Sequence, residues 1–385
     1  MTEATPANFG FGEDEEMLRD LARKFLDENL PITQLRELVA LDSDSAYERG
    51  ERNPWDEGLW KKMVELGWTG LAVPESSGGV GFSLAGIAGL VEEVGAHALP
   101  SPLISTLIAT FVLRESENSG KTLEEIAGGR AASLAITNAA GNWDPCTSAI
   151  KANEESEGVR LTGAAHFVQD AFKADFFVVS ANLGDELILC KVPAEATGVS
   201  LSQDHIHDLT RDQGTLELEN VLVLADAILT RDGAKALDRA WPALLVIVAA
   251  DLCGSSEWQL QTTVQYAKDR SQFERQLGFF QAVKHPLVNA MIDIDSARSL
   301  LYHAACEFDQ RSDDALAAAR MAKSQASDAG GFISSRSVQL HGGYGFTWEA
   351  DVHLYFKRSM HNQALYGDGA FQRMLLAETM IGPLK

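Results

Sequence analysis

The spacing of apolar residues changes twice along the 385-residue chain, and this limits the fold more than any other feature. Over residues 1–130, apolar residues recur at helical spacing, as in Met17 and Leu21. Over 131–230, short runs alternate between polar and apolar residues, most clearly in Thr215–Leu224, which is typical of strands. Over 231–385 the helical period returns. We therefore expect an α+β fold with these three domains: helical, mostly antiparallel β, and helical.

Individual elements follow from the same patterns. In the first domain we expect helices over Trp60–Leu66 and Leu84–Val94, each followed by glycine, with a loop over Gly70–Gly81. The expected strands are Ser133–Ile136, Gly158–Thr162, Phe176–Ser180, Glu186–Val192 and Thr215–Leu224. The expected helices of the last domain are Ala243–Lys268, Gln281–Arg311, Asp314–Leu340 and Gly369–Met380, enough for a four-helix bundle.

Composition excludes several classes of function. The chain has 32 lysines and arginines and 55 aspartates and glutamates, which gives a net charge of −23. Such an acidic chain is not expected to bind nucleic acid. No apolar run is long enough to span a membrane, and Met1–Phe9 has no secretory pattern. Four scattered cysteines and nine histidines without ligand spacing predict no disulfide framework and no metal site. We expect a cytoplasmic protein.

Three motifs carry a resemblance to a known family. The first is the glycine-rich loop Glu65–Gly81, the second is Asp269–Gly278 followed by Phe280-Gln281, and the third is Gln339–Phe346 (QLHGGYGF). Together with their spacing and the α–β–α order, they resemble the acyl-CoA dehydrogenases along nearly the whole chain. The resemblance implies a β-barrel-like middle domain, a C-terminal four-helix bundle, FAD, an acyl-CoA thioester substrate and a tetramer built as a pair of dimers.

The second and third motifs fit a clamp for the ADP half of FAD. Arginine can neutralise a pyrophosphate, an aromatic ring can cover the adenosine, and glycines let the backbone approach a phosphate. If the preceding helix continues, Arg270 and Phe273 share one of its faces. By resemblance the clamp serves an FAD whose flavin lies in a neighbouring subunit. Its expected residues are Arg270, Phe273, Gln281, Gln339, Gly342 and Gly343.

The catalytic half departs from the family pattern. Family members remove the α-proton with a buried glutamate, while the β-hydrogen leaves as hydride to the flavin. The two positions that supply this glutamate hold Tyr366 and Leu244 here. Asp368 is the nearest carboxylate, and we favour a helix N-cap for it over a displaced base. Of the family's flavin-side loop, Thr137 remains as a cofactor contact, in a segment that reads ITNAAGNWD.

This combination is expected of the non-catalytic partner in an α2β2 acyl-CoA dehydrogenase, a type of enzyme known for steroid side chains and other bulky acyl-CoA substrates. Three alternatives stay open. The chain could be a self-sufficient homotetrameric enzyme with Asp368 as its base. It could be a scaffold or binding protein of the same fold without chemistry. It could also perform other CoA chemistry, such as an elimination that needs no carboxylate base.

Overall fold

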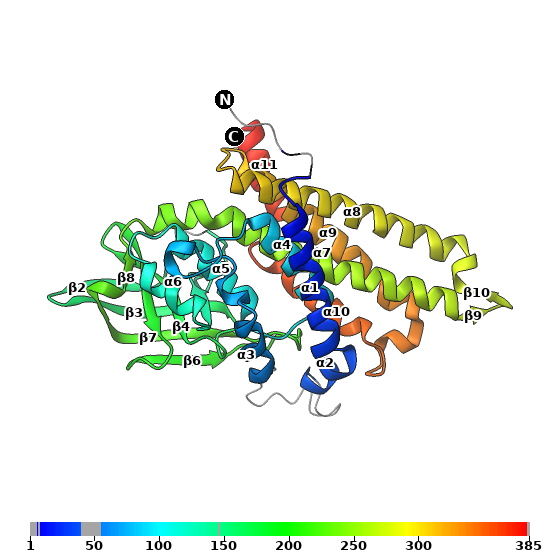
Figure 1. Cartoon of the computed structure of the whole chain (residues 1–385), viewed down its shortest axis with the longest axis horizontal. Coiled ribbons are helices and arrows are strands. Elements are labelled where there is room, and N and C mark those ends of the chain that lie inside the picture. Colours follow the sequence, from blue (N-terminus) through cyan, green and yellow to red (C-terminus); the bar gives the residue numbers. More distant parts are fainter. Residues whose placement is uncertain (1–5, 7, 40–54, 145–146, 383–385) are drawn as a thin grey trace.

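The computed structural model describes residues 6, 8–39, 55–144 and 147–382. Helices come first, a large sheet follows, and helices complete the chain (Figure 1). The predicted α–β–α order is therefore confirmed. All strands of the large sheet fall between residues 132 and 230, while the domain boundaries themselves stay predictions.

The N-terminal part holds six helices within the described residues. Two of them, α4 and α5, are mostly apolar and almost entirely buried, because they pack against α7 from the C-terminal part, and α5 also packs against strand β1. Ser83 caps α4 by accepting a hydrogen bond from the Gly86 N–H at 3.1 Å. The helices are α1 (Glu13–Asn29), α2 (Ile32–Val39), α3 (Glu57–Glu65), α4 (Leu84–Ala96), α5 (Leu103–Arg114) and α6 (Gly120–Ala127).

The sheet has the order β6-β7-β3-β2-β4-β5-β8, with β1 beside β4. Most pairs are antiparallel, as predicted, while β1 and β2 each run parallel to β4. Because β6 and β8 form its edges within the described residues, the sheet is open, and the expected barrel describes it only loosely. The strands are β1 (Ala132–Ala135), β2 (Lys151–Glu155), β3 (Gly158–Gln169), β4 (Phe176–Leu183), β5 (Glu186–Pro193), β6 (Val199–Gln203), β7 (Gln213–Leu224) and β8 (Ile228–Thr230).

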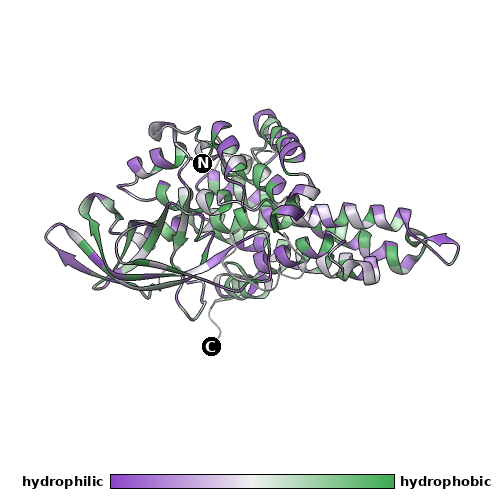
Figure 2. Cartoon of the chain, turned by 90° about the horizontal axis from the view of Figure 1, so that it is seen from below, coloured by the Kyte–Doolittle hydropathy of each residue, from purple (hydrophilic) through white to green (hydrophobic). Residues whose placement is uncertain are grey.

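Helix α7 packs against helices of both the N-terminal and the C-terminal part. It is 37 residues long, and residues 240–256 are buried because α4, α5, α9 and α10 surround it. The bundle extends away from the sheet, and its far end is the hydrophilic hairpin β9–β10 (Figure 2). The elements are α7 (Gly233–Asp269), β9 (Ser271–Gln272), β10 (Arg275–Gln276), α8 (Gln281–Asp309), α9 (Ala315–His341), α10 (Val352–Ala364) and α11 (Gly369–Ile381), which confirms the four predicted helices.

A buried ion cluster joins the sheet domain to the bundle. Asp251 on α7 accepts from Arg358 Nε on α10 at 3.0 Å and from Asn362 Nδ2 at 2.6 Å, and it also pairs with Arg211. Arg358 Nη1 donates to Thr210 Oγ1 at 2.8 Å. Lys357 and Arg358 are adjacent cations of the kind expected on a solvated helix face or at a phosphate, but the Arg358 side chain is fully buried and is available for neither.

Other expectations concern cysteines, metal and membrane. Cys190, Cys253 and Cys306 are buried free thiols, and Cys146 lies outside the described residues. Residues 1–5 and 7, part of the segment considered for a secretory signal, also lie outside them. No group of histidine, cysteine, aspartate or glutamate side chains in the described ranges could hold a metal ion. Likewise, none of the helices described has the length and apolar character needed to cross a membrane.

Candidate functional site

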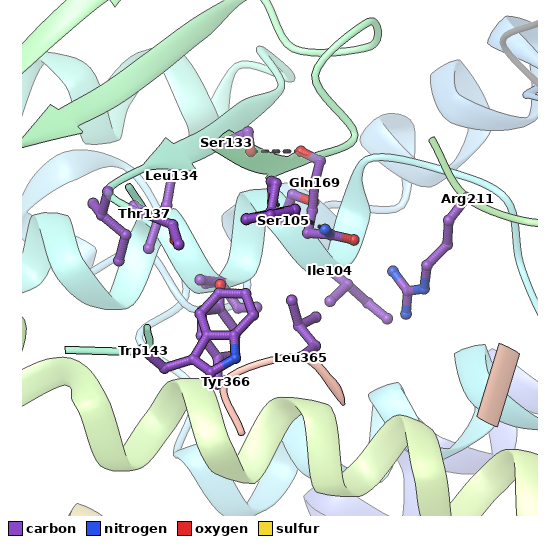
Figure 3. A pocket seen from close by; sticks show the side chains of 13 residues that line it. Ile104, Ser105, Ser133, Leu134, Thr137, Trp143, Gln169, Arg211, Leu365 and Tyr366 are labelled. Carbon is purple, nitrogen blue, oxygen red and sulfur yellow. Dashed lines mark hydrogen bonds between the residues drawn. The ribbon is translucent and has the colours of Figure 1, made fainter. Parts of the chain in front are cut away.

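Aromatic rings fill the space between the sheet domain and the bundle. Tyr366 lies in the loop after α10, and Trp143 lies in the segment after β1. The buried ring of Tyr366 contacts the ring of Trp143 edge-to-face (Figure 3). Its centroid is 5.1 Å from that of Trp143 and 5.5 Å from that of Trp241 on α7. We call these three residues the aromatic plug. Offset and edge-to-face ring pairs of this kind stabilise a structure beyond the area they bury.

The cleft that remains beside the aromatic plug is very small. The volume open to the centre of a water-sized sphere is about 20 Å³, which holds roughly one water molecule. Among the described residues, none of those that line it carries a carboxylate. These are Ile104, Ser105, Ile108, Ser133, Leu134, Ile136, Thr137, Trp143, Phe167, Gln169, Arg211, Leu365 and Tyr366.

Polar groups in this wall are engaged with one another. Ser133 Oγ donates to the Gln169 carbonyl oxygen at 2.6 Å (Figure 3). Gln169 Oε1 lies 2.7 Å from Nε2 of His361 on α10. Burial lowers the pKa of His361 to about 4, so the ring is neutral at pH 7 and its Nε2 donates to this acceptor. Arg211 pairs with Asp251 instead of presenting a free cation.

Lys323 holds the loop that carries Tyr366. Its buried Nζ donates to Gln363 O at 3.0 Å, Gly367 O at 2.9 Å and Ser327 Oγ at 3.0 Å. Burial lowers the pKa of Lys323 to about 7, although Asp368 favours the charged form. Tyr366 has φ +57°, a left-handed conformation that costs a bulky residue free energy and must be held by its surroundings.

Neither of the two positions expected to supply a base, which hold Tyr366 and Leu244, places a carboxylate at the cleft. Leu244 and Leu245 are fully buried in α7, where they pack in the apolar core. Asp368 is exposed, does not line the cleft, and caps α11 by accepting from the Phe371 N–H at 2.8 Å. A general base needs burial to raise its pKa towards the working pH, and Asp368 lacks that environment.

The expected clamp residues lie at the opposite end of the bundle. Helix α7 ends at Asp269 and Arg270 is extended, so the condition for a helix face shared with Phe273, a helix that continues this far, is not met. Instead, Phe273 and Glu274 form the two-residue tip of hairpin β9–β10, with φ +53° and +60°. Left-handed residues at both central positions define a type I′ turn, which strongly favours Asn and Gly. The tip presents Phe273 with 86% of its surface exposed.

The third motif lies next to this hairpin. Tyr266, one turn before Arg270, stacks on His341 at a centroid distance of 4.2 Å, which joins the ends of α7 and α9. After His341, Gly342 adopts φ +63° with ψ −144°, a conformation that needs glycine. A Cβ at Gly342 or Gly343 would meet nothing within 4 Å, so the space beside this backbone is open to a ligand.

Gln281 and Gln339 complete this end. Gln281 is exposed in the first turn of α8, directly after the hairpin segment. Gln339 is exposed on the last turn of α9 and lines a groove of about 670 Å³. The structure therefore gathers the six clamp residues at one end of the bundle, with open space around them.

Thr137 does not belong to that group. It lines the cleft with Tyr366 and Trp143. Trp241 beside the cleft and Asp269 beside the clamp are both on α7. At 1.5 Å per residue they lie roughly 40 Å apart along the helix axis. The cleft and the expected clamp residues of one chain are thus two separate places in the structure.

Sequence reasoning missed some residues at both places. It did not place Trp143, Tyr366 and Trp241 in contact. It also missed Lys323 and Arg336, whose side chain donates to Gln339 Oε1 at 2.6 Å. Lys323 sits in the run ARMAKSQASDAG among small residues, which hints at burial, but nothing in the sequence reveals its acceptors.

Two models of known protein families match parts of this chain. The models "Acyl-CoA dehydrogenase, N-terminal domain" and "Acyl-CoA dehydrogenase, C-terminal domain" match residues 12–116 and 246–381. "Acyl-CoA dehydrogenase IpdE2" of Mycobacterium tuberculosis is 30% identical over 349 residues, covering 90% of this chain and 91% of that protein.

Solved structures are also similar. The chain is similar to one from a variant of the "Tcur3481-Tcur3483 steroid ACAD", with a TM-score of 0.85 and 28% identity over 96% of this chain and 98% of that chain. It is similar to one from the ChsE4-ChsE5 complex of Mycobacterium tuberculosis, with a TM-score of 0.86 and 26% identity over 98% of this chain and 100% of that chain.

Proposed function

The chain belongs to the acyl-CoA dehydrogenase family, and we propose that it is the partner subunit of a heteromeric, FAD-dependent enzyme of that family. In this proposal the unlike chain supplies the flavin cleft and the catalytic base. This chain supplies the clamp for the ADP half of the same FAD, so each composite site lies across the interface between two chains.

The observation that carries the proposal is the filled cleft. Where the family's flavin-side loop and base loop meet, the aromatic plug leaves room for about one water molecule. A tricyclic flavin ring does not fit there. Tyr366 occupies the base position. Because burial raises the pKa of its phenol, this group keeps its own proton and cannot accept the α-proton of a thioester.

The clamp, by contrast, fits an ADP group. Arg270 is exposed and offers a charged fork to a pyrophosphate, and Gly342 and Gly343 leave open backbone beside it. Phe273 offers its exposed ring face to the adenosine, while Gln281 and Gln339 offer amide groups. When bound, FAD supplies the hydride acceptor of the dehydrogenation. Since this clamp lies roughly 40 Å from the cleft of its own chain, it serves a flavin seated in another chain.

The relatives support the class of substrate. One similar structure is a "steroid ACAD" that pairs Tcur3481 with Tcur3483, and another is the ChsE4-ChsE5 complex. We therefore assign an acyl-CoA thioester with a bulky group, such as a steroid side chain, to the unlike chain's cleft. The negative charge of this chain does not attract CoA, in agreement with a substrate site on the partner.

The test is the flavin content and native mass of two preparations. One is this chain expressed alone, and the other is this chain co-expressed with an unlike acyl-CoA dehydrogenase from the same organism. We expect little FAD on this chain alone and about one FAD per pair of unlike chains in an α2β2 complex.

Two outcomes contradict the proposal. One FAD per chain in a homotetramer would restore the self-sufficient enzyme, and Asp368→Asn would then be the variant to assay for lost turnover. No FAD in any assembly would favour a scaffold without chemistry.

A further inference from the structure

Arg336 lies next to the clamp but belongs to none of the motifs. It precedes Gln339 by three residues on α9, so both side chains project from one face of the helix. Its Nη1 donates to Gln339 Oε1 at 2.6 Å, and its guanidinium lies over the Phe332 ring, 5.4 Å from the centroid. Arg336 is thus held from both sides, by an amide and by an aromatic face.

This contact fixes which end of the Gln339 amide is offered to a ligand. A guanidinium can only donate hydrogen bonds, and the amide nitrogen of glutamine can also only donate. The atom that faces Arg336 must therefore be the oxygen, whichever way the amide is drawn. The nitrogen is left for the groove of about 670 Å³ that Gln339 lines.

The orientation suits the ADP half of FAD. Phosphate oxygens accept hydrogen bonds and cannot donate them, and ribose oxygens also accept. A freely turning amide would present its oxygen to them part of the time, at a cost in affinity. An amide that is already oriented binds without that loss of conformational freedom.

We propose that Arg336 is a positioning residue of the clamp, which donates to Gln339 and thereby directs the amide nitrogen of Gln339 at the ADP half of FAD. This inference rests on the proposed function, because it takes Gln339 as a contact of an FAD shared with an unlike chain. It adds a residue that none of the three motifs contains, and a reason why Gln339 donates rather than accepts.

The experiment measures FAD release and FAD affinity in the FAD-loaded assembly that contains this chain. Three variants vary the donor at residue 336: Arg336→Lys keeps a donor, Arg336→Met has no polar group, and Arg336→Glu can only accept. We expect affinity close to wild type for Lys, a loss of about three- to tenfold for Met, the size of one hydrogen bond, and a larger loss for Glu, which turns the amide around.

Each variant is also made in a Gln339→Ala background, because charge alone would give the same order. If Arg336 acts through Gln339, the three variants have equal affinities once the amide is gone. If they keep their order in that background, Arg336 contacts FAD directly and the proposal is overturned. Equal affinities of all three in the wild-type background also overturn it.

Arg270→Ala separates this result from the proposed function. If Arg270→Ala and Gln339→Ala both leave FAD bound as in wild type, the clamp itself is wrong. If they release FAD while the residue-336 series has no effect, only the role of Arg336 fails. The melting temperature and native mass of every variant establish that folding and assembly are intact.

Discussion

The rings of Trp143 and Tyr366 meet edge-to-face, with centroids 5.1 Å apart and an interplanar angle of 66°. Trp143 comes from the sheet domain and Tyr366 from the loop before α11, so one contact closes the space between two parts of the chain. The space left beside this contact has a volume of about 20 Å³, and this small volume is the basis of the proposed partner-subunit role.

The first prediction concerns the plug. Tyr366→Ala removes a buried ring, and we expect the free energy of unfolding to fall by about 3–5 kcal/mol, as for other buried aromatic truncations. Urea denaturation at pH 7 measures this. The matched control is Phe346→Ala, which truncates a ring that is 79% exposed and should change stability by less than about 0.5 kcal/mol. Equal effects of both variants would mean that the plug does not contribute to the fold.

The plug also marks the limit of the sequence analysis. Tyr366 and Leu244 were identified as non-catalytic because their neighbours in the chain match family motifs. The contact itself joins residues 143, 241 and 366, and no periodicity relates positions so far apart in sequence. Periodicity did predict the long helices, because α8 and α9 each bury one stripe. It could not assign α5, whose sequence LISTLIATFVLR is mostly apolar.

The second prediction separates binding from folding at the hairpin tip. Phe273 and Glu274 both have left-handed backbones, which glycine adopts without strain. We therefore expect Phe273→Gly and Glu274→Gly each to raise stability by up to about 1 kcal/mol. Only Phe273→Gly should lower the FAD content of the heteromer, because only that ring covers the adenosine. Equal FAD content in the two variants would remove Phe273 from the clamp.

The third prediction tests Asp368 as a cap. Asp368→Ala removes the acceptor of the Phe371 N–H and should cost about 0.5–2 kcal/mol, whereas Asp368→Asn should be nearly neutral because asparagine caps equally well. Thermal denaturation compares the two. Turnover of the heteromer with an acyl-CoA should be unchanged in Asp368→Asn. A loss of turnover without a loss of stability would make Asp368 the base.

Arg358 shows why charge patterns in a sequence mislead. The run LYFKRS reads as a helix with a cationic face, yet one of its two cations is fully buried. The partner, Asp251, lies on α7, 107 residues earlier in the chain. Burial opposes the charge on Asp251, but Arg358 and Arg211 outweigh it and keep the pKa of this carboxyl below its ordinary value. Nothing in the sequence indicates that Asp251 and Arg358 form a pair.

The fourth prediction follows from that pair. Arg358→Met takes from the buried Asp251 one of its two arginine partners and from Thr210 Oγ1 its arginine donor, while Arg211 and Asn362 stay on Asp251, and we expect a loss of up to about 3–5 kcal/mol in unfolding free energy. The control is Arg231→Met, which breaks an exposed pair with Glu154 and should cost less than about 1 kcal/mol. Comparable losses would show that burial of the Asp251 pair carries no special weight.

The fifth prediction is a pH dependence from Lys323. The unfolded chain keeps the proton of this lysine up to its ordinary pKa of 10.5, whereas in the fold burial lowers the pKa to about 7. Between these values the unfolded state binds more protons, so the contribution of Lys323 to stability rises with pH. Below pH 7 both states are protonated and the contribution is constant.

Lys323→Met removes this titration. Urea unfolding at half-unit steps from pH 6 to pH 9 should therefore show the stability of wild type rising relative to Lys323→Met above pH 7 and running parallel to it below. Lys121→Met, which removes an exposed lysine, is the matched control for the loss of a charge. A difference between wild type and Lys323→Met that stays constant up to pH 9 would mean that Lys323 keeps its charge. In that case its three acceptors, and chiefly the carbonyls of Gln363 and Gly367, hold the ammonium against the cost of burial.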